Sequence, residues 1–322
     1  MRTAELGRSR PTAVTELGLG TAPLAGLFTP VGADEAAACV DAAWESGIRY
    51  FDTAPHYGIG LSERRLGAAL RGRPRDSYTL STKVGRLLEP VAEPTGDDLA
   101  NGFAVPATHR RVWDFSADGV RRSIDDSLAR LGLDRIDIVY LHDPDDHGPQ
   151  ALAEAYPALE QLRAEGVVRA IGAGMNQSAM LTRFVRETDV DVVLLAGRYT
   201  LLDQDGLTEL LPEAQRRGVG VVVGGAFNSG LLADPRPGAT FDYTAAPDAL
   251  LARALRIKAV CERHGVPLRA AALRFPLDHP AVRGVLVGAR SAAEVADAAT
   301  MTAHRIPPEL WSELGSEGLL PR

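Results

Sequence analysis

Cysteine is scarce in this sequence: only Cys39 and Cys261 occur among 322 residues. No CxxC spacing is present, and two distant thiols cannot make the disulfide framework of a small secreted domain or a cysteine-rich metal site. Both lie in stretches whose apolar residues have helical spacing. We expect two reduced, structural thiols and a reducing compartment.

Long apolar runs and an excess of positive charge are also missing. No stretch approaches the roughly 20 apolar residues of a membrane-spanning helix, and residues 1–14 lack the apolar core of a signal peptide. Acidic residues (42) outnumber Lys and Arg (35), for a formal charge of -7. This balance disfavours nucleic acid and anionic membranes as partners, because both attract basic surfaces. We expect a cytoplasmic protein, and the oligomeric state stays open.

Short runs rich in Val, Ile and Leu recur eight times and alternate with stretches of helical periodicity. Alternating strands and helices are typical of a parallel sheet, and near-continuous apolar strands indicate that both of its faces are covered. Eight such units favour a (β/α)8 barrel, which at this length forms one domain, residues 1–322. A doubly wound open sheet is the alternative, because periodicity does not report closure. The expected strands lie within residues 16–21, 48–53, 78–84, 136–142, 168–174, 190–197, 219–225 and 283–288.

Glycines and long connections mark where the regular elements end. Four helical stretches close with a glycine, the usual residue just past a helix, at Gly47, Gly72, Gly132 and Gly166. Two connections, residues 86–115 and 228–248, are longer than barrel loops require, and loops of this kind are commonly functional. Because each follows a strand, both should lie on the C-terminal face, where barrel enzymes have their active sites.

Ionisable residues stand at the ends of three expected strands. They are Asp52, Lys83 and His142, and Tyr57 follows Asp52 on the loop that leaves its strand. A buried ammonium needs a counter-ion, and Asp52 on the neighbouring strand is the obvious one for Lys83. Each residue alone also has a structural explanation: a turn aspartate, a structural ion pair or a core histidine. Their joint occurrence at consecutive strand ends favours a catalytic site.

Proton transfer is the chemistry that this cluster predicts. A lysine ammonium within a few ångströms stabilises a phenolate, so we expect Lys83 to lower the pKa of Tyr57. Tyr57 can then exchange a proton with a substrate oxygen that His142 orients. This mechanism requires no metal.

At these residues the sequence resembles the aldo-keto reductases. The similar segments span roughly Leu17 to Ala299, and the segment FDTAPHYGIGLSERRLGAAL is the most specific of them. The resemblance implies a (β/α)8 barrel, NAD or NADP bound across the C-terminal face, and a catalytic tetrad of Asp52, Tyr57, Lys83 and His142. The long loops are most similar to family members that oxidise an aldose, such as L-fucose or D-arabinose, at the anomeric carbon to a lactone. Members that act on pyridoxal or other aldehydes are similar neighbours.

The same resemblance implies a set of cofactor contacts. The sequence departs from the family pattern at Met175, where a serine is usual, at Ala196, where a glutamine is usual, and at Gly224, where many members have an aromatic ring. Ser291 and Glu294 form a capping box, and a carboxylate at position 294 would repel the 2'-phosphate of NADP, so we favour NAD. Arg290 could reverse that preference. The implied contacts are Gly20, Thr21, Ala22, Asn176, Gly224, Phe227, Asn228, Ser229, Gly230, Leu231, Gly288, Arg290 and Glu294.

Substrate contacts are expected from the loop of residues 86–115. Trp113 and Phe103 could stack on a sugar face, and Arg110 or Arg111 could bond its hydroxyls; alternatively, Trp113 only anchors the loop. Two other functions stay open. The chain could be a nucleotide-binding regulatory subunit, or a barrel lyase that uses Lys83 as a Schiff-base amine, although a neighbouring Asp52 favours a charged lysine.

Overall fold

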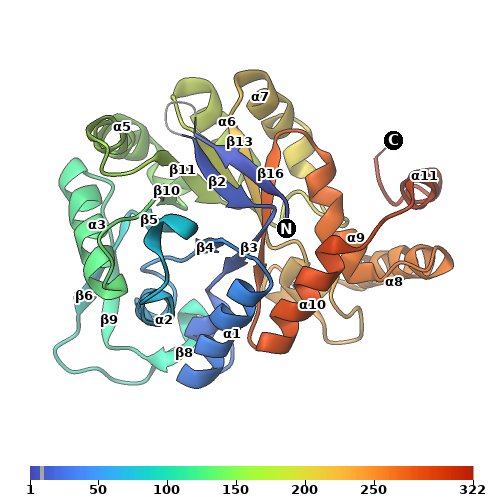
Figure 1. Cartoon of the computed structure of the whole chain (residues 1–322), viewed down its shortest axis with the longest axis horizontal. Helices are drawn as coiled ribbons and strands as arrows, with labels where there is room; N and C mark the ends of the chain where they lie inside the picture. The colour runs from blue at the N-terminus through green and yellow to red at the C-terminus, as the bar shows by residue number, and fades with distance from the viewer. Residues whose placement is uncertain (8–10, 322) are drawn as a thin grey trace.

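Eight parallel strands close into a barrel in the computed structural model, which describes residues 1–7 and 11–321 (Figure 1). Each predicted apolar run contributes one barrel strand. Because β16 pairs with β3, the last and first of these strands meet and the sheet has no open edge. The predicted (β/α)8 barrel is therefore confirmed, and the alternative of a doubly wound open sheet is excluded. In order around the barrel, the strands are β10 (Ile138–His142), β11 (Ala170–Met175), β12 (Val192–Ala196), β13 (Gly220–Gly224), β16 (Val282–Gly288), β3 (Leu17–Gly20), β4 (Tyr50–Asp52) and β5 (Thr79–Val84).

An N-terminal hairpin closes one end of the barrel. Strands β1 (Thr3–Leu6) and β2 (Thr12–Thr15) pair antiparallel, and their Leu6 and Val14 are buried inside the barrel with Tyr50 and Tyr140. The hydroxyl of Thr79, at the start of β5, donates to the Ala13 carbonyl, 2.7 Å away. The hairpin was not predicted, and it leaves the C-terminal ends of the strands as the accessible end.

Helices surround the barrel, and two of them lie to one side of it. Helices α8 and α11, at the right of Figure 1, share a separate apolar cluster that includes Ile257, Cys261 and Leu310. Cys39 is buried in α1 and Cys261 in α8, both as free thiols, as predicted. None of the helices in the described part of the chain is long and apolar enough to cross a membrane. The helices are α1 (Ala33–Glu45), α2 (Leu61–Leu70), α3 (Ala117–Leu131), α4 (Gly148–Gln150), α5 (Tyr156–Glu165), α6 (Ser178–Glu187), α7 (Leu210–Arg217), α8 (Asp248–Arg263), α9 (Leu268–Arg274), α10 (Ala292–Ala303) and α11 (Pro308–Ser316).

The predicted glycines end their helices. Gly132 and Gly166 are the C-cap residues of α3 and α5, with φ of 62° and 81°. Gly47 and Gly72 follow the C-cap residues of α1 and α2 and are also left-handed, with φ of 83° and 84°. A residue with a Cβ would be strained in this conformation, which explains the choice of glycine.

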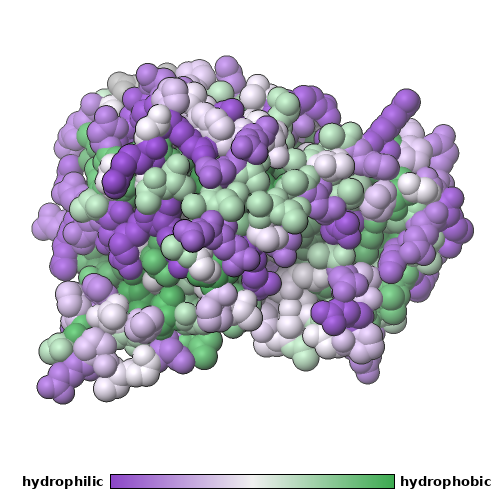
Figure 2. Space-filling model, turned by 60° about the horizontal axis from the view of Figure 1, so that its bottom comes forward, coloured by the Kyte–Doolittle hydropathy of each residue, from purple (hydrophilic) through white to green (hydrophobic). Residues whose placement is uncertain are grey.

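The two long connections fold into short hairpins beside the C-terminal ends of the strands. In the first, β6 (Arg86–Pro90) pairs with β9 (His109–Trp113) and β7 (Asp97–Asp98) with β8 (Phe103–Pro106). In the second, β14 (Thr240–Phe241) pairs with β15 (Thr244–Ala245). The connections reach the lower side of Figure 1, at its left and right. Figure 2 brings that side forward and shows it indented between two lobes.

Candidate active site

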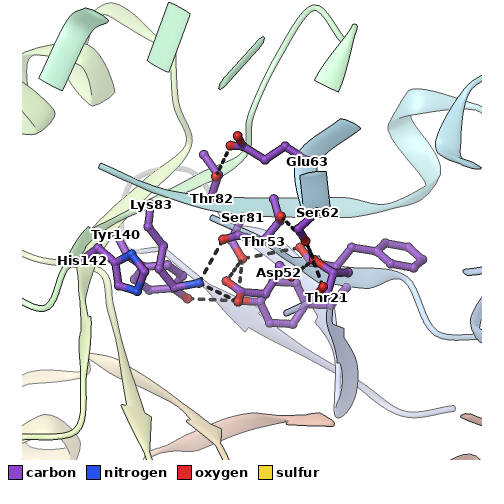
Figure 3. A network of polar contacts seen from close by, with 12 residues as sticks. Thr21, Asp52, Thr53, Ser62, Glu63, Ser81, Thr82, Lys83, Tyr140 and His142 are labelled. Carbon is purple, nitrogen blue, oxygen red and sulfur yellow. Dashed lines mark hydrogen bonds and ion pairs between the residues drawn. The ribbon is translucent and has the colours of Figure 1, made fainter. Parts of the chain in front are cut away.

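A buried ion pair joins the ends of two neighbouring barrel strands. Lys83 Nζ lies 2.7 Å from Asp52 Oδ2, and both side chains are almost completely buried, with 2% and 4% exposed. Because β4 and β5 are paired in parallel, with Asp52 opposite Ser81, the two side chains point to the same place. Nζ also donates to the Thr53 carbonyl (3.0 Å), and the Ser81 hydroxyl donates to Asp52 Oδ1 (2.7 Å) (Figure 3). The predicted pair is therefore present, with hydrogen bonds to both of its charges.

Tyr57 and His142 lie beside this pair. The Lys83 amine is 4.8 Å from the centre of the half-buried Tyr57 ring. The His142 ring, at the end of β10, stands perpendicular to the Tyr57 ring with 5.8 Å between their centres. The structure thus brings together the four side chains that the sequence predicted as a cluster.

Burial has a larger effect on the pKa of Tyr57 than the charge of Lys83 has. Desolvation raises the pKa of Tyr57 to about 12, although the charge of Lys83 and a hydrogen bond with it act in the opposite direction. Lys83 acts in the predicted direction, but burial outweighs it, so the expected net lowering of the Tyr57 pKa is wrong for the free protein. The reason lies in the tertiary structure. Burial costs the phenolate more solvation free energy than its attraction to one neighbouring ammonium offsets. Tyr57 is therefore a phenol at neutral pH.

Lys83 and His142 have definite charge states. Desolvation lowers the pKa of Lys83, but the charge of Asp52, followed by Tyr57 and hydrogen bonds to both residues, raises it above the ordinary value overall. A lysine held in its ammonium form is a poor Schiff-base nucleophile, which argues against the lyase alternative. Desolvation, with the charges of Arg86 and Lys83, holds the pKa of His142 well below its usual range. His142 is accordingly neutral.

Hydroxyl groups beneath the site hold the segment that carries Tyr57. Thr21 at the end of β3 donates to the Asp52 carbonyl (2.8 Å), and its hydroxyl lies 2.6 Å from that of Ser62 in α2. Ser62 also accepts from Thr53 (2.9 Å) and donates to the Thr21 carbonyl (2.9 Å) (Figure 3). These buried bonds tie the ends of β3 and β4 to the start of α2, so the loop between Asp52 and Ser62 has fixed ends.

A second network, which the sequence did not predict, lies on the other side of Tyr57. Arg111 on β9 donates to His56 Nδ1 and, from Nη2, to the His56 carbonyl (2.8 Å). Its guanidinium also binds both oxygens of buried Asp98, at 2.8 and 2.6 Å. Asn101 completes the network with a bond to Asp98 (2.8 Å). The position of His56 next to Tyr57 in sequence was the only available signal.

The predicted substrate residues occupy different surroundings. Phe103 is buried and packs against Tyr57, with ring centres 6.1 Å apart. Arg110 points outward, 71% exposed, and pairs with Glu89 at 2.6 Å. Trp113 is partly exposed, stacks on Phe115 (5.9 Å, 22°) and lies under the Arg86 guanidinium (4.3 Å). Phe103 therefore packs against a member of the tetrad, whereas Arg110 and Trp113 are engaged with Glu89, Phe115 and Arg86.

A cavity of about 550 Å³ lies between the two hairpins of residues 86–115. Arg86, Arg110, Arg111 and Trp113 are among its lining residues, and Tyr57 is not. Two of its lining residues also bond next to the tetrad, Arg111 to His56 and Arg86 to Asp143.

Asparagine side chains gather around the ends of β11, β12 and β13. A Cβ placed on Gly197 would be 4.0 Å from the amide nitrogen of Asn176 and 3.8 Å from that of Asn228. Asn176 donates to the Ala196 carbonyl (3.1 Å) and Asn228 to that of Gly197 (3.2 Å). The carbonyl oxygen of the Asn228 side chain is buried without a partner among the described residues. An unpaired buried acceptor of this kind fits a ligand that carries N–H donors.

The segment after β13 has an unusual backbone. Asn228, Ser229 and Gly230 are consecutive residues with φ of 46°, 58° and 104°. The hairpin that follows is fixed to the barrel because Arg198 holds both oxygens of Asp242, at 3.0 and 2.7 Å. Phe227 is half-buried and Leu231 is buried, so the apolar residues of the segment anchor it while its polar backbone stays near the strand ends.

The start of α10 follows the last barrel strand. Ser291 accepts from the Glu294 amide (3.3 Å), and the Glu294 carboxylate accepts from the amide of Arg290 (2.8 Å). Arg290 Nη2 reaches the Leu27 carbonyl (3.3 Å). Gly288 lies against Pro23, which a Cβ would approach to 2.9 Å. Ser291 therefore caps the helix as predicted, whereas the Glu294 carboxylate binds the amide one residue before the N-cap, so the second bond of the capping box is displaced by one residue. The first-turn amides face the C-terminal side of the barrel, where they suit a phosphate.

Comparison with known proteins places this geometry in a family. Residues 16–316 match the Aldo/keto reductase family. The chain belongs to the aldo/keto reductases. D-threo-aldose 1-dehydrogenase of a Pseudomonas species is 51% identical over 96% of this chain and 95% of that protein. Pyridoxal 4-dehydrogenase of Microbacterium luteolum is 44% identical over 98% and 97%.

Solved structures of the family agree with the fold. The holo form of an aldo-keto reductase from Bacillus halodurans matches with a TM-score of 0.76 and 27% identity, over 99% of this chain and 96% of that one. This aldo/keto reductase is an NAD(P)-dependent oxidoreductase, which confirms the predicted family, enzyme class and cofactor class. A small-molecule substrate follows from the family.

Proposed function

We propose that this chain oxidises an aldose, such as L-fucose or D-arabinose, at the anomeric carbon to its lactone, with NAD as the preferred acceptor. The observation that carries the proposal is the cluster of four side chains. The Lys83 amine lies 2.7 Å from the Asp52 carboxylate and 4.8 Å from the centre of the Tyr57 ring, and the centres of the Tyr57 and His142 rings are 5.8 Å apart. The 51% identity with D-threo-aldose 1-dehydrogenase over nearly the whole of both chains supports the substrate class.

The proposed roles follow from the charge states. Tyr57, once its own proton has passed to solvent, accepts the proton of the anomeric hydroxyl, and the ammonium of Lys83, held by Asp52, stabilises the phenolate that this step consumes. Neutral His142 binds the same oxygen and sets its orientation. As the O–H bond breaks toward Tyr57, the C–H bond at the anomeric carbon gives up its electron pair as hydride and a carbonyl forms. When bound, the nicotinamide supplies the acceptor for that hydride.

The described residues fit such a cofactor. The unpaired Asn228 oxygen, together with Asn176, suits a carboxamide beside the strand ends. The left-handed segment Asn228–Gly230 and the first turn of α10 provide backbone for a pyrophosphate. Gly20, Thr21, Ala22 and Gly224 end β3 and β13 around the same opening. We assign these groups to cofactor binding as part of the proposal.

The preference for NAD rests on Glu294. Its carboxylate is fixed near the start of α10 by the bond from the Arg290 amide. A phosphate on the adenosine ribose would meet this negative charge if it lay at the same turn, whereas two free ribose hydroxyls would not. Arg290 is the opposing cation, and its guanidinium is engaged with the Leu27 carbonyl.

Pyridoxal is the second candidate substrate. The 44% identity with pyridoxal 4-dehydrogenase favours it, as does the apolar wall that Phe103 builds beside Tyr57. An aromatic aldehyde would pack on such a wall, whereas an aldose would need hydrogen-bond donors for its hydroxyls.

One substrate panel tests the proposal. Purified protein is assayed by nicotinamide absorbance with L-fucose, D-arabinose, L-galactose, pyridoxal and simple aldehydes, with NAD and NADP and in both directions. We expect lactone formation from the aldoses with NAD. Turnover of pyridoxal with no aldose oxidised would replace the proposal by its alternative. The Tyr57→Phe variant, run in parallel, separates enzymatic turnover from background reduction.

A further inference from the structure

His56 is held in a single protonation form by its neighbours. Its Nδ1 accepts a hydrogen bond from Arg111 Nε. A guanidinium N–H can only donate, so Nδ1 must carry a lone pair and the ring proton must be on Nε2. The fork between Arg111 and Asp98, at 2.8 and 2.6 Å, leaves the guanidinium no freedom to turn away. His56 is therefore a neutral imidazole that presents Nε2–H.

The free N–H of His56 belongs to a ring that lies beside the reaction centre. Its ring lies 6.1 Å from that of Tyr57 and 5.7 Å from that of His142, tilted by 61° and 76°. The Phe103 ring, which also packs against Tyr57, lies 5.4 Å from the His56 ring. Within residues 1–7 and 11–321, His56 Nε2 makes no hydrogen bond. It is also open to solvent, in contrast to His142 Nδ1, which is buried without a partner. A donor without a partner thus stands next to the two residues that would hold the reacting oxygen.

We propose that His56 is a specificity-determining residue whose Nε2–H binds the hydroxyl on the carbon next to the reacting carbon. Arg111 is its positioning residue, because it fixes the tautomer and the ring through Asp98. The substrate class that follows is the 2-hydroxy aldehydes and the aldoses, in preference to aldehydes without that hydroxyl. This inference rests on the proposed function and extends it to a second group of the substrate.

A pair of substrates that differ by one hydroxyl tests the role of His56. D-arabinose and 2-deoxy-D-ribose differ only at carbon 2. We expect wild-type kcat/KM to favour D-arabinose by roughly 10-fold to 100-fold, because the bound deoxy sugar would cover the N–H without pairing it. His56→Phe keeps a ring but no donor, and should bring that ratio close to one by lowering kcat/KM for D-arabinose only. His56→Gln, whose amide restores an N–H, should recover part of the ratio.

The matched control is His109→Phe. His109 lies in β9, the strand that carries Arg111, and its Nδ1 pairs with the exposed Thr108 hydroxyl (3.0 Å). This variant should retain the wild-type ratio. An equal loss of kcat/KM on both sugars in His56→Phe would mean a merely structural role and would overturn the inference.

Two further readouts separate this inference from the proposed function. If wild type oxidises no aldose, the proposed function fails, and the same variants are then compared in the reduction of lactaldehyde and propanal, which again differ by one hydroxyl. Loss of the preference for lactaldehyde in His56→Phe supports the inference, and an unchanged preference overturns it.

The ¹⁵N resonances of the His56 ring should report the Nε2–H form across about pH 5 to 8. In Arg111→Lys, which cannot keep the fork, the tautomer should become mixed and the substrate preference should fall with it.

Discussion

The ammonium of Lys83 lies 4.8 Å from the centre of the Tyr57 ring, yet the pKa of the phenol is raised to about 12. Desolvation is the largest cause, and the lysine charge offsets only part of it. The free protein therefore keeps the proton on Tyr57 and is ready to act as an acid. To act as a base, the phenol must lose that proton, and Lys83 makes the loss possible without making it spontaneous at neutral pH.

A pH dependence follows from this balance. A phenol with a raised pKa is protonated at neutral pH and gives up its proton as pH rises, so kcat/KM for aldose oxidation should increase from about pH 7 to pH 10. Aldehyde reduction, which needs the protonated form, should be flat over the same range and then fall. Neutral His142 adds no acidic limb near its usual pKa, because its pKa lies well below that range. Initial rates in both directions across this range check the prediction; oxidation that falls with rising pH would contradict it.

Tyr57→Phe should separate chemistry from binding. The substitution keeps the ring against Phe103 and His142 but removes the group that transfers the proton. We expect kcat to fall by roughly 100-fold to 10,000-fold, with little change in the Kd of the nicotinamide cofactor. Turnover and cofactor binding by fluorescence titration are measured on the same preparation. Near wild-type turnover in this variant would eliminate the proposed mechanism.

The free energy of unfolding should depend on whether the buried Lys83 ammonium keeps its counter-ion, Asp52. Asp52→Asn keeps a side chain for the Ser81 bond but leaves the buried ammonium without its counter-ion, so we expect a loss of about 3 to 5 kcal/mol in the free energy of unfolding. The double variant Asp52→Asn, Lys83→Met removes both charges and should be more stable than Asp52→Asn alone. Urea unfolding of the two variants and the wild type measures both differences. A double variant less stable than the single one would show that the ammonium is not the source of the loss.

The sequence predicted those features that depend on local pattern. Eight apolar runs gave eight barrel strands, and the strand-end positions of Asp52 and Lys83 sufficed to pair them, since parallel strands bring their carboxyl ends together. The pKa of Tyr57 could not be predicted this way, because burial depends on everything packed around the ring. The Arg111–His56 bond could not be predicted either. It joins residues 55 positions apart, and it depends on the register of the β6–β9 hairpin, which no sequence pattern indicated.

Cofactor preference should change with the charge at position 294. Glu294→Gln keeps an oxygen to accept the bond from the Arg290 amide, and Ser291 still caps the helix, so only the negative charge is lost. We expect kcat/KM with NADP to rise roughly fivefold, which corresponds to about 1 kcal/mol for one exposed charge, and kcat/KM with NAD to change little. Asp297→Asn is the matched control, because Asp297 is in the same helix and its carboxylate binds Arg269 (2.8 Å). If both variants shift the NADP to NAD ratio equally, the net charge of the face decides the preference rather than Glu294. If neither variant shifts it, the 2'-phosphate of NADP does not lie against the first turn of α10, and the preference for NAD loses its physical basis.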